Sequence, residues 1–149
     1  MKWTHAAIGV MLVCAMPAQK PARQFMNPEG LPKTFGYTHV VTSRPGRMMF
    51  ISGQGGAAGG QMPKDVTAQA ENTFKNMGTC LAGAGAKFED IVKINYFVTD
   101  LANTQELRRV RAKYLNQQNP PAATLVQAGL GPGMLLEVEA IAIVAEKTD

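Results

Sequence analysis

The sequence predicts a two-layer α+β domain in which two helices cover one face of a mixed β-sheet, in the order β-β-α-β-α-β-β. Two segments repeat apolar residues at helical spacing, and several shorter segments are dense in β-branched and aromatic residues. With 149 residues, of which 46% are hydrophobic and 17% charged, the chain has the size and composition of one globular domain. The net charge of +4 is modest, so composition gives no strong case for nucleic-acid binding.

The first eighteen residues have the layout of a secretory signal peptide. Lys2 precedes an apolar run from Ala6 to Met16, and the small residues Ala15 and Ala18 offer cleavage sites. The run is too short for a permanent transmembrane helix. We therefore expect residues 1–18 to be removed and the mature protein to be secreted or periplasmic, with no membrane association. An N-terminal core helix is the alternative, and without a functional leader the protein would be cytoplasmic.

A single domain, residues 34–149, is expected to follow an extended N-terminal arm. The arm, residues 19–33, is polar and rich in proline, and we expect it to have no core of its own. Residues 37–42 and 48–52 predict a β-hairpin, because a Pro-Gly pair lies in the connection between them. The glycine-rich stretch 53–60 matches no phosphate-binding motif and could be either a flexible loop or a binding loop.

Two amphipathic helices and a strand between them form the middle of the chain. Residues 64–84 predict the first helix, whose apolar face comprises Val66, Ala70, Phe74, Met77, Leu81 and Ala84. Residues 88–99 are the most strand-like run. In the second helix, which begins after residues 100–103, the buried stripe comprises Leu107, Val110 and Tyr114 and the solvated side Arg108, Arg109 and Lys113. Arg111 borders the stripe and could reach beneath it toward a site.

The stretch Pro120–Val144 reads as two β-strands joined by a Gly/Pro turn. Alternation along the second strand places Glu137 and Glu139 on the same face, roughly 7 Å apart. Burying either carboxylate without a partner would cost several kcal/mol. That face must therefore meet water, a cation, a ligand or another subunit, and a half-solvated strand with two surface glutamates is one way to satisfy this.

Few side chains outside the leader offer catalytic chemistry. No cluster of histidine and cysteine has metal-ligand spacing, so we expect neither a metal site nor a cofactor. Cys80 falls in the first predicted helix, where a small buried residue is expected. The remaining candidates are the hydroxyls of Tyr37, Ser52 and Thr124, the backbone amides near Gly53, and the carboxylates of Glu137 and Glu139. Such a set could orient a small polar ligand and activate a water through a carboxylate base.

Several stretches together resemble the YjgF/RidA family. They are Gly36-Tyr37, residues 51–54 (Ile-Ser-Gly-Gln), residues 90–93 with 97–101, and above all residues 136–142 (Leu-Glu-Val-Glu-Ala-Ile-Ala). The similarity runs from about Asn27 to the C-terminus. It implies a chorismate-mutase-like fold and a homotrimer that binds a small-molecule ligand in clefts between subunits. It also implies hydrolysis of reactive enamines and imines of small 2-keto acids, with release of ammonia.

The resemblance assigns roles to four residues. Carried over by position, Tyr37 would close the pocket, and Ser52 with the Gly53 amide would contact the ligand. Glu137 would hold and activate the attacking water.

One departure from the family pattern concerns the substrate anchor. Deaminating members carry a Pro-Ala-Arg-Ser/Thr motif at the start of the penultimate strand, whose arginine grips the substrate carboxylate. Here residues 120–124 read Pro-Pro-Ala-Ala-Thr, so Ala122 or Ala123 occupies the arginine position, beside Thr124. Losing such a contact weakens affinity by about 10- to 100-fold or more. Arg108 or Arg111 could substitute for it from the second helix.

Two functions are compatible with this pattern. The first is a hydrolase that deaminates small reactive enamines or imines such as 2-iminopropanoate, with a substrate altered by the loss of the arginine. The second is a non-catalytic trimer of the same fold that binds or protects a small ligand. Ribonuclease activity, reported for some relatives, finds little support because no histidine pair is available and the basic cluster is small. No nucleic-acid partner is expected.

Overall fold

The computed structural model describes residues 22–146, which form six strands, two α-helices and two short 3-10 helices. The predicted signal peptide lies outside the described residues. Within them, no helix combines the length and apolar character needed to cross a membrane. The elements are β1 (Arg23–Met26), β2 (Val40–Ser43), β3 (Gly46–Gly55), α1 (Val66–Gly83), η1 (Phe88–Asp90), β4 (Ile91–Val98), η2 (Leu101–Asn103), α2 (Thr104–Arg111), β5 (Ala122–Gln127) and β6 (Leu136–Ala145).

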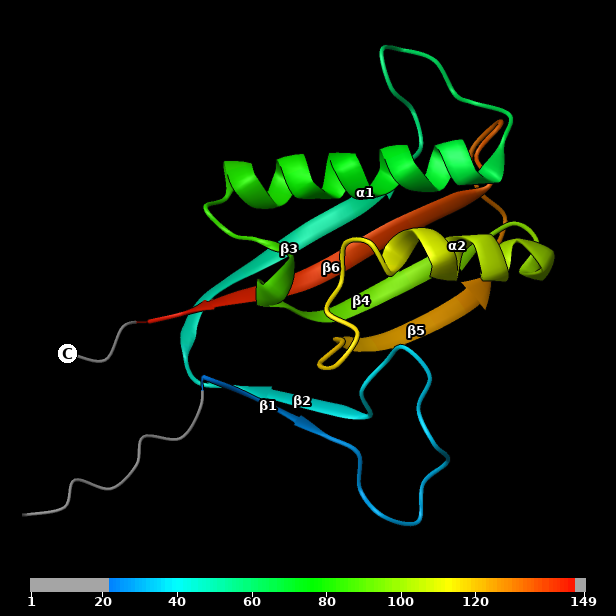
Figure 1. Ribbon diagram of the computed structural model, residues 1–149. Coiled ribbons are helices and arrows are strands. Elements are labelled where there is room, and N and C mark those ends of the chain that lie inside the picture. The colour runs from blue at the N-terminus through cyan, green and yellow to red at the C-terminus, as the bar shows by residue number, and fades with distance from the viewer. Residues whose placement is uncertain (1–21, 147–149) are drawn as a thin grey trace, which may run out of the picture.

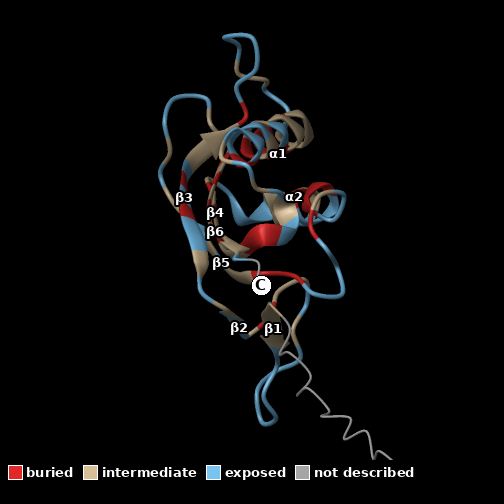
Figure 2. Ribbon diagram, turned by 90° about the vertical axis from the view of Figure 1, so that its left-hand side faces the viewer, coloured by how far each residue is buried: buried red, intermediate tan, exposed pale blue. Residues whose placement is uncertain are grey.

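Four strands form the main sheet, in the spatial order β3-β6-β4-β5. Strand β6 is antiparallel to both of its neighbours, β3 and β4, whereas β5 runs parallel to β4. Helices α1 and α2 lie on one face of this sheet, and no described helix covers the other (Figures 1 and 2). The predicted two-layer α+β fold, with a mixed sheet and two helices on one face, is confirmed.

Alternation along β6 distributes its side chains between the two faces of the sheet, as predicted. Leu136, Val138 and Ala142 are fully buried beneath the helices, where they pack with the apolar stripe of α1. Glu137 and Glu139 lie half-buried on the face without helices. The carboxylates thereby avoid the cost of complete burial. We call this helix-free side of the main sheet the open face.

Helix α1 begins two residues later than predicted. Asp65 is its N-cap, and the carboxylate accepts a hydrogen bond of 2.8 Å from the Ala68 amide. The side of α1 away from the core is partly covered as well. Asn72 and Asn76 donate hydrogen bonds to carbonyl oxygens of residues 55–57. The helix therefore holds the beginning of the glycine-rich stretch in place.

The predicted hairpin between residues 37–42 and 48–52 is wrong. Strand β2 pairs with β1 in a separate two-stranded sheet, whereas β3 pairs with β6. Only Arg44 and Pro45 separate β2 from β3, and the proline, which has no N–H to donate to a ladder, lies where the chain leaves one sheet for the other. The partner of β2 comes from the predicted arm, so the chain has one strand more than the predicted order.

The two predicted strands of Pro120–Val144 are present as β5 and β6, with β4 between them in the sheet. Two smaller predictions need correction. Residues 88–90 form the 3-10 helix η1, and the strand begins only at Ile91. Cys80 is exposed, because it lies on the outer side of α1, one residue before the buried Leu81.

Candidate active site

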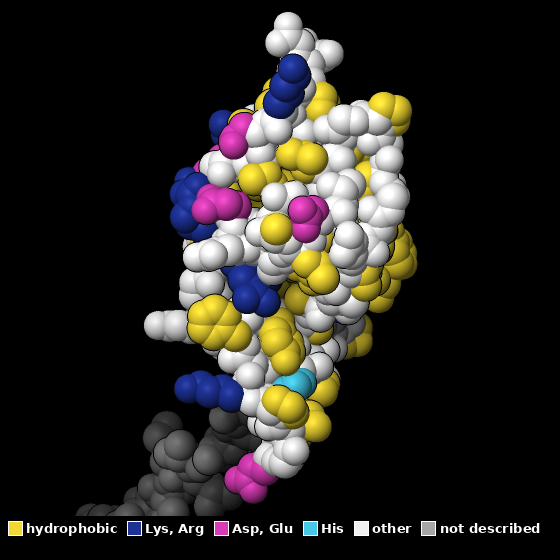
Figure 3. Space-filling view, turned by 90° about the vertical axis from the view of Figure 1, so that its right-hand side faces the viewer, with side chains coloured by type: hydrophobic (Ala, Val, Ile, Leu, Met, Phe, Trp, Pro, Cys, Tyr) yellow, Lys and Arg dark blue, Asp and Glu magenta, His cyan; other side chains and the backbone are white. Residues whose placement is uncertain are grey.

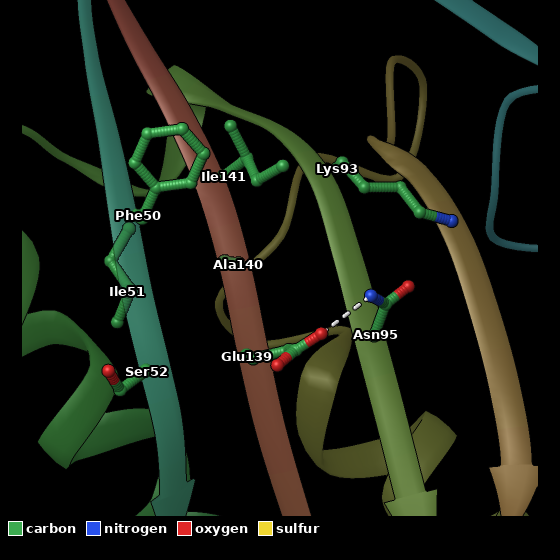
Figure 4. A pocket seen from close by; sticks show the side chains of 8 residues that line it. All are labelled: Phe50, Ile51, Ser52, Lys93, Asn95, Glu139, Ala140 and Ile141. Atoms are coloured by element: carbon green, nitrogen blue, oxygen red, sulfur yellow. Dashed lines mark hydrogen bonds between the residues drawn. The ribbon is translucent and has the colours of Figure 1, made fainter.

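A first hollow, of about 270 Å³, lies on the open face across β3, β6 and β4 (Figure 4). Its polar lining includes Ser52, Lys93, Asn95 and Glu139. The Asn95 side-chain amide donates a hydrogen bond of 2.8 Å to Oε1 of Glu139, drawn as a dashed line in Figure 4. Lys93 Nζ donates a hydrogen bond of 2.6 Å to Oγ1 of Thr124 on β5. The hollow therefore has a polar lining that extends toward the edge strand.

Glu137 lies against a β-bulge in β3. Residues 51 and 54 of β3 pair with residues 140 and 138 of β6, so Ser52 and Gly53 together oppose Glu139. A Cβ atom at Gly53 would lie 1.7 Å from Oε1 of Glu137. The carboxylate can occupy this place only because residue 53 has no side chain. The bulge thus brings three predicted site residues together: Ser52, Gly53 and Glu137.

A second hollow, of about 220 Å³, lies between β5, α2 and residues 33–37. Five predicted site residues line it: Tyr37, Arg108, Arg111, Ala123 and Thr124. Three further lining residues have polar or aromatic side chains that sequence reasoning did not identify: Lys33, Phe35 and Tyr96. On the face of the molecule shown in Figure 3, basic side chains lie close to exposed hydrophobic ones.

Buried Thr38 fastens the segment that carries Tyr37 to the start of β5. Its hydroxyl donates a hydrogen bond of 2.7 Å to the Pro120 carbonyl, and its amide donates one of 3.2 Å to the Pro121 carbonyl. The Tyr37 ring also makes an edge contact with His39, with ring centres 5.4 Å apart. These contacts fix one wall of the second hollow.

Arg111 enters the second hollow from the last residue of α2. It is only 8% exposed, and its guanidinium carbon lies 5.5 Å from the centre of the Tyr96 ring. Its Nη2 donates to the Phe35 carbonyl at 3.4 Å, a long contact. Gly36 has a φ of +71°, and a Cβ there would lie 2.1 Å from Nη2. Gly36 therefore supplies both the backbone conformation and the space that the guanidinium occupies.

Tyr96 forms the floor of the second hollow. It is 1% exposed, and its buried hydroxyl lies close to Arg111. Burial raises the pKa of Tyr96 to about 12, and the positive charge of Arg111 opposes that shift. The phenol is therefore protonated at neutral pH and can donate a hydrogen bond.

The structure thus divides the predicted site residues of one chain into two groups. Ser52, Gly53 and Glu137 lie on β3 and β6, whereas the other five lie around β5 and α2. Thr124 links the groups, because it lines the second hollow and accepts a hydrogen bond from Lys93 of the first. Within residues 22–146, no group of three or more His, Cys, Asp and Glu side chains could hold a metal ion.

Sequence reasoning missed two kinds of lining residue. Lys93 and Asn95 alternate along β4 and so share a face, a signal that was present in the sequence. Tyr96 lies on the opposite face of the same strand, and only the packing of α2 and residues 33–37 brings it into a hollow. No local pattern marks it.

Fold and site together define a small α+β protein with a polar hollow on its open sheet face and a basic hollow at the sheet edge. The chain belongs to the YjgF/RidA family: the family model described as Endoribonuclease L-PSP matches residues 29–144. It is 32% identical over 129 residues to protein DfrA of Myxococcus xanthus, an alignment that covers 84% of this chain and 98% of that protein.

Two further relatives agree with this assignment. The chain is 31% identical over 100 residues to human 2-iminobutanoate/2-iminopropanoate deaminase, covering 65% of this chain and 73% of the human protein. Among solved structures, the Rid family protein YyfB from Yersinia pestis superposes with a TM-score of 0.72 at 31% identity. That match covers 83% of this chain and 99% of YyfB. The fold is therefore that of the YjgF/Rid proteins.

Proposed function

We propose that the protein is a hydrolase that deaminates small reactive enamines or imines, of the 2-iminopropanoate type, to a ketone or keto acid and ammonia. The observation that carries the proposal is the Glu137 carboxylate, held against the Gly53 bulge beside Ser52. The name of the human relative, an iminobutanoate and iminopropanoate deaminase, supports the same class of reaction.

The reaction needs a base and a hydrogen-bond donor, and this chain has candidates for both. Glu137 would take a proton from water as the water oxygen bonds to the imine carbon, while the C=N electron pair moves to nitrogen, which takes up that proton from Glu137. In the resulting carbinolamine the hydroxyl proton would pass through Glu137 to the amino nitrogen, the C–N bond would break as the C=O bond forms, and ammonia would leave. The Gly53 amide, next to the carboxylate, and the Ser52 hydroxyl, which lines the first hollow, would orient the reacting group.

A homotrimer is part of this proposal, because one chain alone keeps the two groups of site residues apart. The open face exposes large apolar side chains, with Phe50 76% and Met48 52% exposed. Such a surface is typical of a subunit interface. Packing this face against a second subunit would place the second hollow of one chain beside Glu137 of the next and form a cleft for a small ligand.

The alternative function, a non-catalytic trimer that binds or protects a small ligand, is favoured by Ala123. In deaminating relatives an arginine is expected at this position, whereas here an alanine lines the second hollow. Because Ala123 faces that hollow, arginine introduced there would reach the same space. A gain of imine hydrolysis in Ala123→Arg would show an otherwise intact hydrolytic site, whereas no gain would favour the non-catalytic binding function.

The primary test measures ammonia release from freshly generated 2-iminopropanoate. We expect the wild type to accelerate release and Glu137→Ala to lose roughly 100-fold or more of that acceleration. Glu89→Gln is the control, since it changes an exposed carboxylate in η1 that lines neither hollow. Equal rates for the wild type and Glu137→Ala would remove the proposed role of Glu137.

A further inference from the structure

We propose that Arg111, assisted by Arg108, binds the carboxylate of the substrate and so replaces from helix α2 the strand arginine that is missing at Ala123. The inference deepens the proposed function and rests on it for its catalytic meaning. It assigns the site to anionic 2-imino acids and their 2-keto acid products, in preference to uncharged imines.

Only some of the basic side chains on α2 and the turn that follows it are ion-paired. Arg109 is ion-paired with Glu106 at 2.8 Å, and Lys113 is ion-paired with Glu71. Neither Arg108 nor Arg111 forms an ion pair with any carboxylate among residues 22–146. The two arginines of this region that lack a counter-ion are thus the two that line the second hollow.

The lining of the second hollow is positively charged. Lys33, Arg108 and Arg111 supply three positive charges, and the lining contains no acidic side chain. Arg111 is almost completely buried, so its charge is poorly screened by water. A buried guanidinium without a counter-ion is costly, and a bound carboxylate would supply the missing charge with two parallel hydrogen bonds.

A hydroxyl donor lies at the same place. Thr124 lines the same hollow, and its hydroxyl accepts a hydrogen bond from Lys93. The hydroxyl hydrogen can therefore be donated to a small carboxylate bound by Arg111.

Arg111 lies where it can take the place of an arginine at position 123. Ala123 on β5 and Arg111 on α2 line one hollow of about 220 Å³. The short alanine leaves room, and Gly36 provides the space through which the Arg111 guanidinium enters. The volume lies below the range of about 300–1,000 Å³ usual for drug-sized ligands, which suits a small keto acid.

The inference is tested by measuring pyruvate binding to the full chain by calorimetry or ligand-observed NMR, with no chemistry involved. We expect Arg111→Ala to weaken pyruvate binding by about 10- to 100-fold, and Arg108→Ala to weaken it less. Arg109→Ala, a change on the same helix in an arginine already paired with Glu106, should leave it unchanged. Pyruvamide, the uncharged analogue, should bind weakly and equally to all four proteins.

Because Arg111 is buried, a folding defect must be separated from a lost contact. Arg111→Gln keeps much of the side-chain volume and should weaken pyruvate binding as Arg111→Ala does. Adding Ala123→Arg to Arg111→Ala should restore binding, since the new guanidinium enters the same hollow. The inference is overturned if Arg111→Ala binds pyruvate like the wild type, if pyruvamide or sulfate binds as tightly as pyruvate, or if the double variant shows no recovery.

The two proposals fail in different ways. Glu137→Ala should lose imine hydrolysis and keep pyruvate binding. If the wild type binds pyruvate through Arg111 but hydrolyses no imine, the proposed function is wrong and the anion site stands. If Arg111→Ala hydrolyses 2-iminopropanoate with an unchanged KM, the anion site is wrong and the proposed function stands.

Discussion

The bulge in β3 and the hollow beneath α2 differ in charge and in how the chain builds them. At the bulge, Glu137 lies on the central strand β6 and Gly53 on its neighbour β3, and ladder pairing sets their places. The second hollow combines residues from a loop, a helix and an edge strand, and side-chain packing sets their places. One region carries carboxylates and the other carries arginines.

This difference separates two tasks of the proposed reaction. A base must keep a fixed distance to the reacting carbon, and central strands provide that rigidity. A residue that binds the substrate carboxylate sets affinity. It can lie on a strand or on a neighbouring helix, provided that its charged group enters the same hollow.

The largest effect on activity should come from Gly53→Ala, which changes the bulge and does not alter the lining of the second hollow. The new methyl group would lie 1.7 Å from Oε1 of Glu137, so the carboxylate has to move away. We expect imine hydrolysis to fall roughly 100-fold while pyruvate binding is retained.

Gly83→Ala is the matched control for this substitution, because a Cβ there meets no atom within 4 Å. It should leave both hydrolysis and binding unchanged. If Gly53→Ala retained full activity, Glu137 would not act from the position that the structure gives it.

A smaller effect is expected from Gly36→Ala, which places a methyl group against a side chain of the second hollow, as Gly53→Ala does at the bulge. The added methyl group would lie 2.1 Å from Nη2 of Arg111, so the guanidinium has to move away. Pyruvate binding should therefore weaken by about tenfold. Gly30→Ala controls for backbone strain: its φ is +83°, but nothing lies within 4 Å of the added atom. Both variants should lose about 1–2 kcal/mol of stability in urea unfolding. Equal pyruvate affinities in the two variants would contradict the role of Gly36.

The contrast also explains how far the sequence could predict the site. Period-two alternation was enough to place Glu137 and Glu139 on one face, because a strand fixes side-chain direction locally. Helical periodicity placed Arg111 only at the border of the buried stripe. Its burial against Tyr96 depends on residues 35–36 folding over it, and Phe35 and Arg111 are 76 residues apart in the sequence. The failed hairpin has the same cause, since the partner of β2 comes from a segment without a strand-like pattern.

The smallest effect should come from pH, through the attachment of α2 to α1. Glu71 on α1 accepts hydrogen bonds from Lys113 and Tyr114, just after α2, and these contacts hold its pKa below the usual 4.5. A lowered carboxylate pKa contributes stability that is present above pH 4.5 and is lost as pH falls through the folded-state pKa. Acid should therefore weaken the attachment of α2 to α1 as the pH falls through the folded-state pKa of Glu71.

Glu71→Gln tests this attachment through urea unfolding at a series of pH values. At neutral pH the variant should be less stable by about 0.2–1 kcal/mol, the range of partly exposed ion pairs. The difference from the wild type should shrink as the pH falls below 4.5, because the wild-type carboxylate then becomes neutral too. Glu89→Gln, for which no ion pair is found among the described residues, is the control and should show no such pH-dependent difference. A stability difference for Glu71→Gln that stayed constant down to the acid transition would show that the α1–α2 attachment does not depend on this charge.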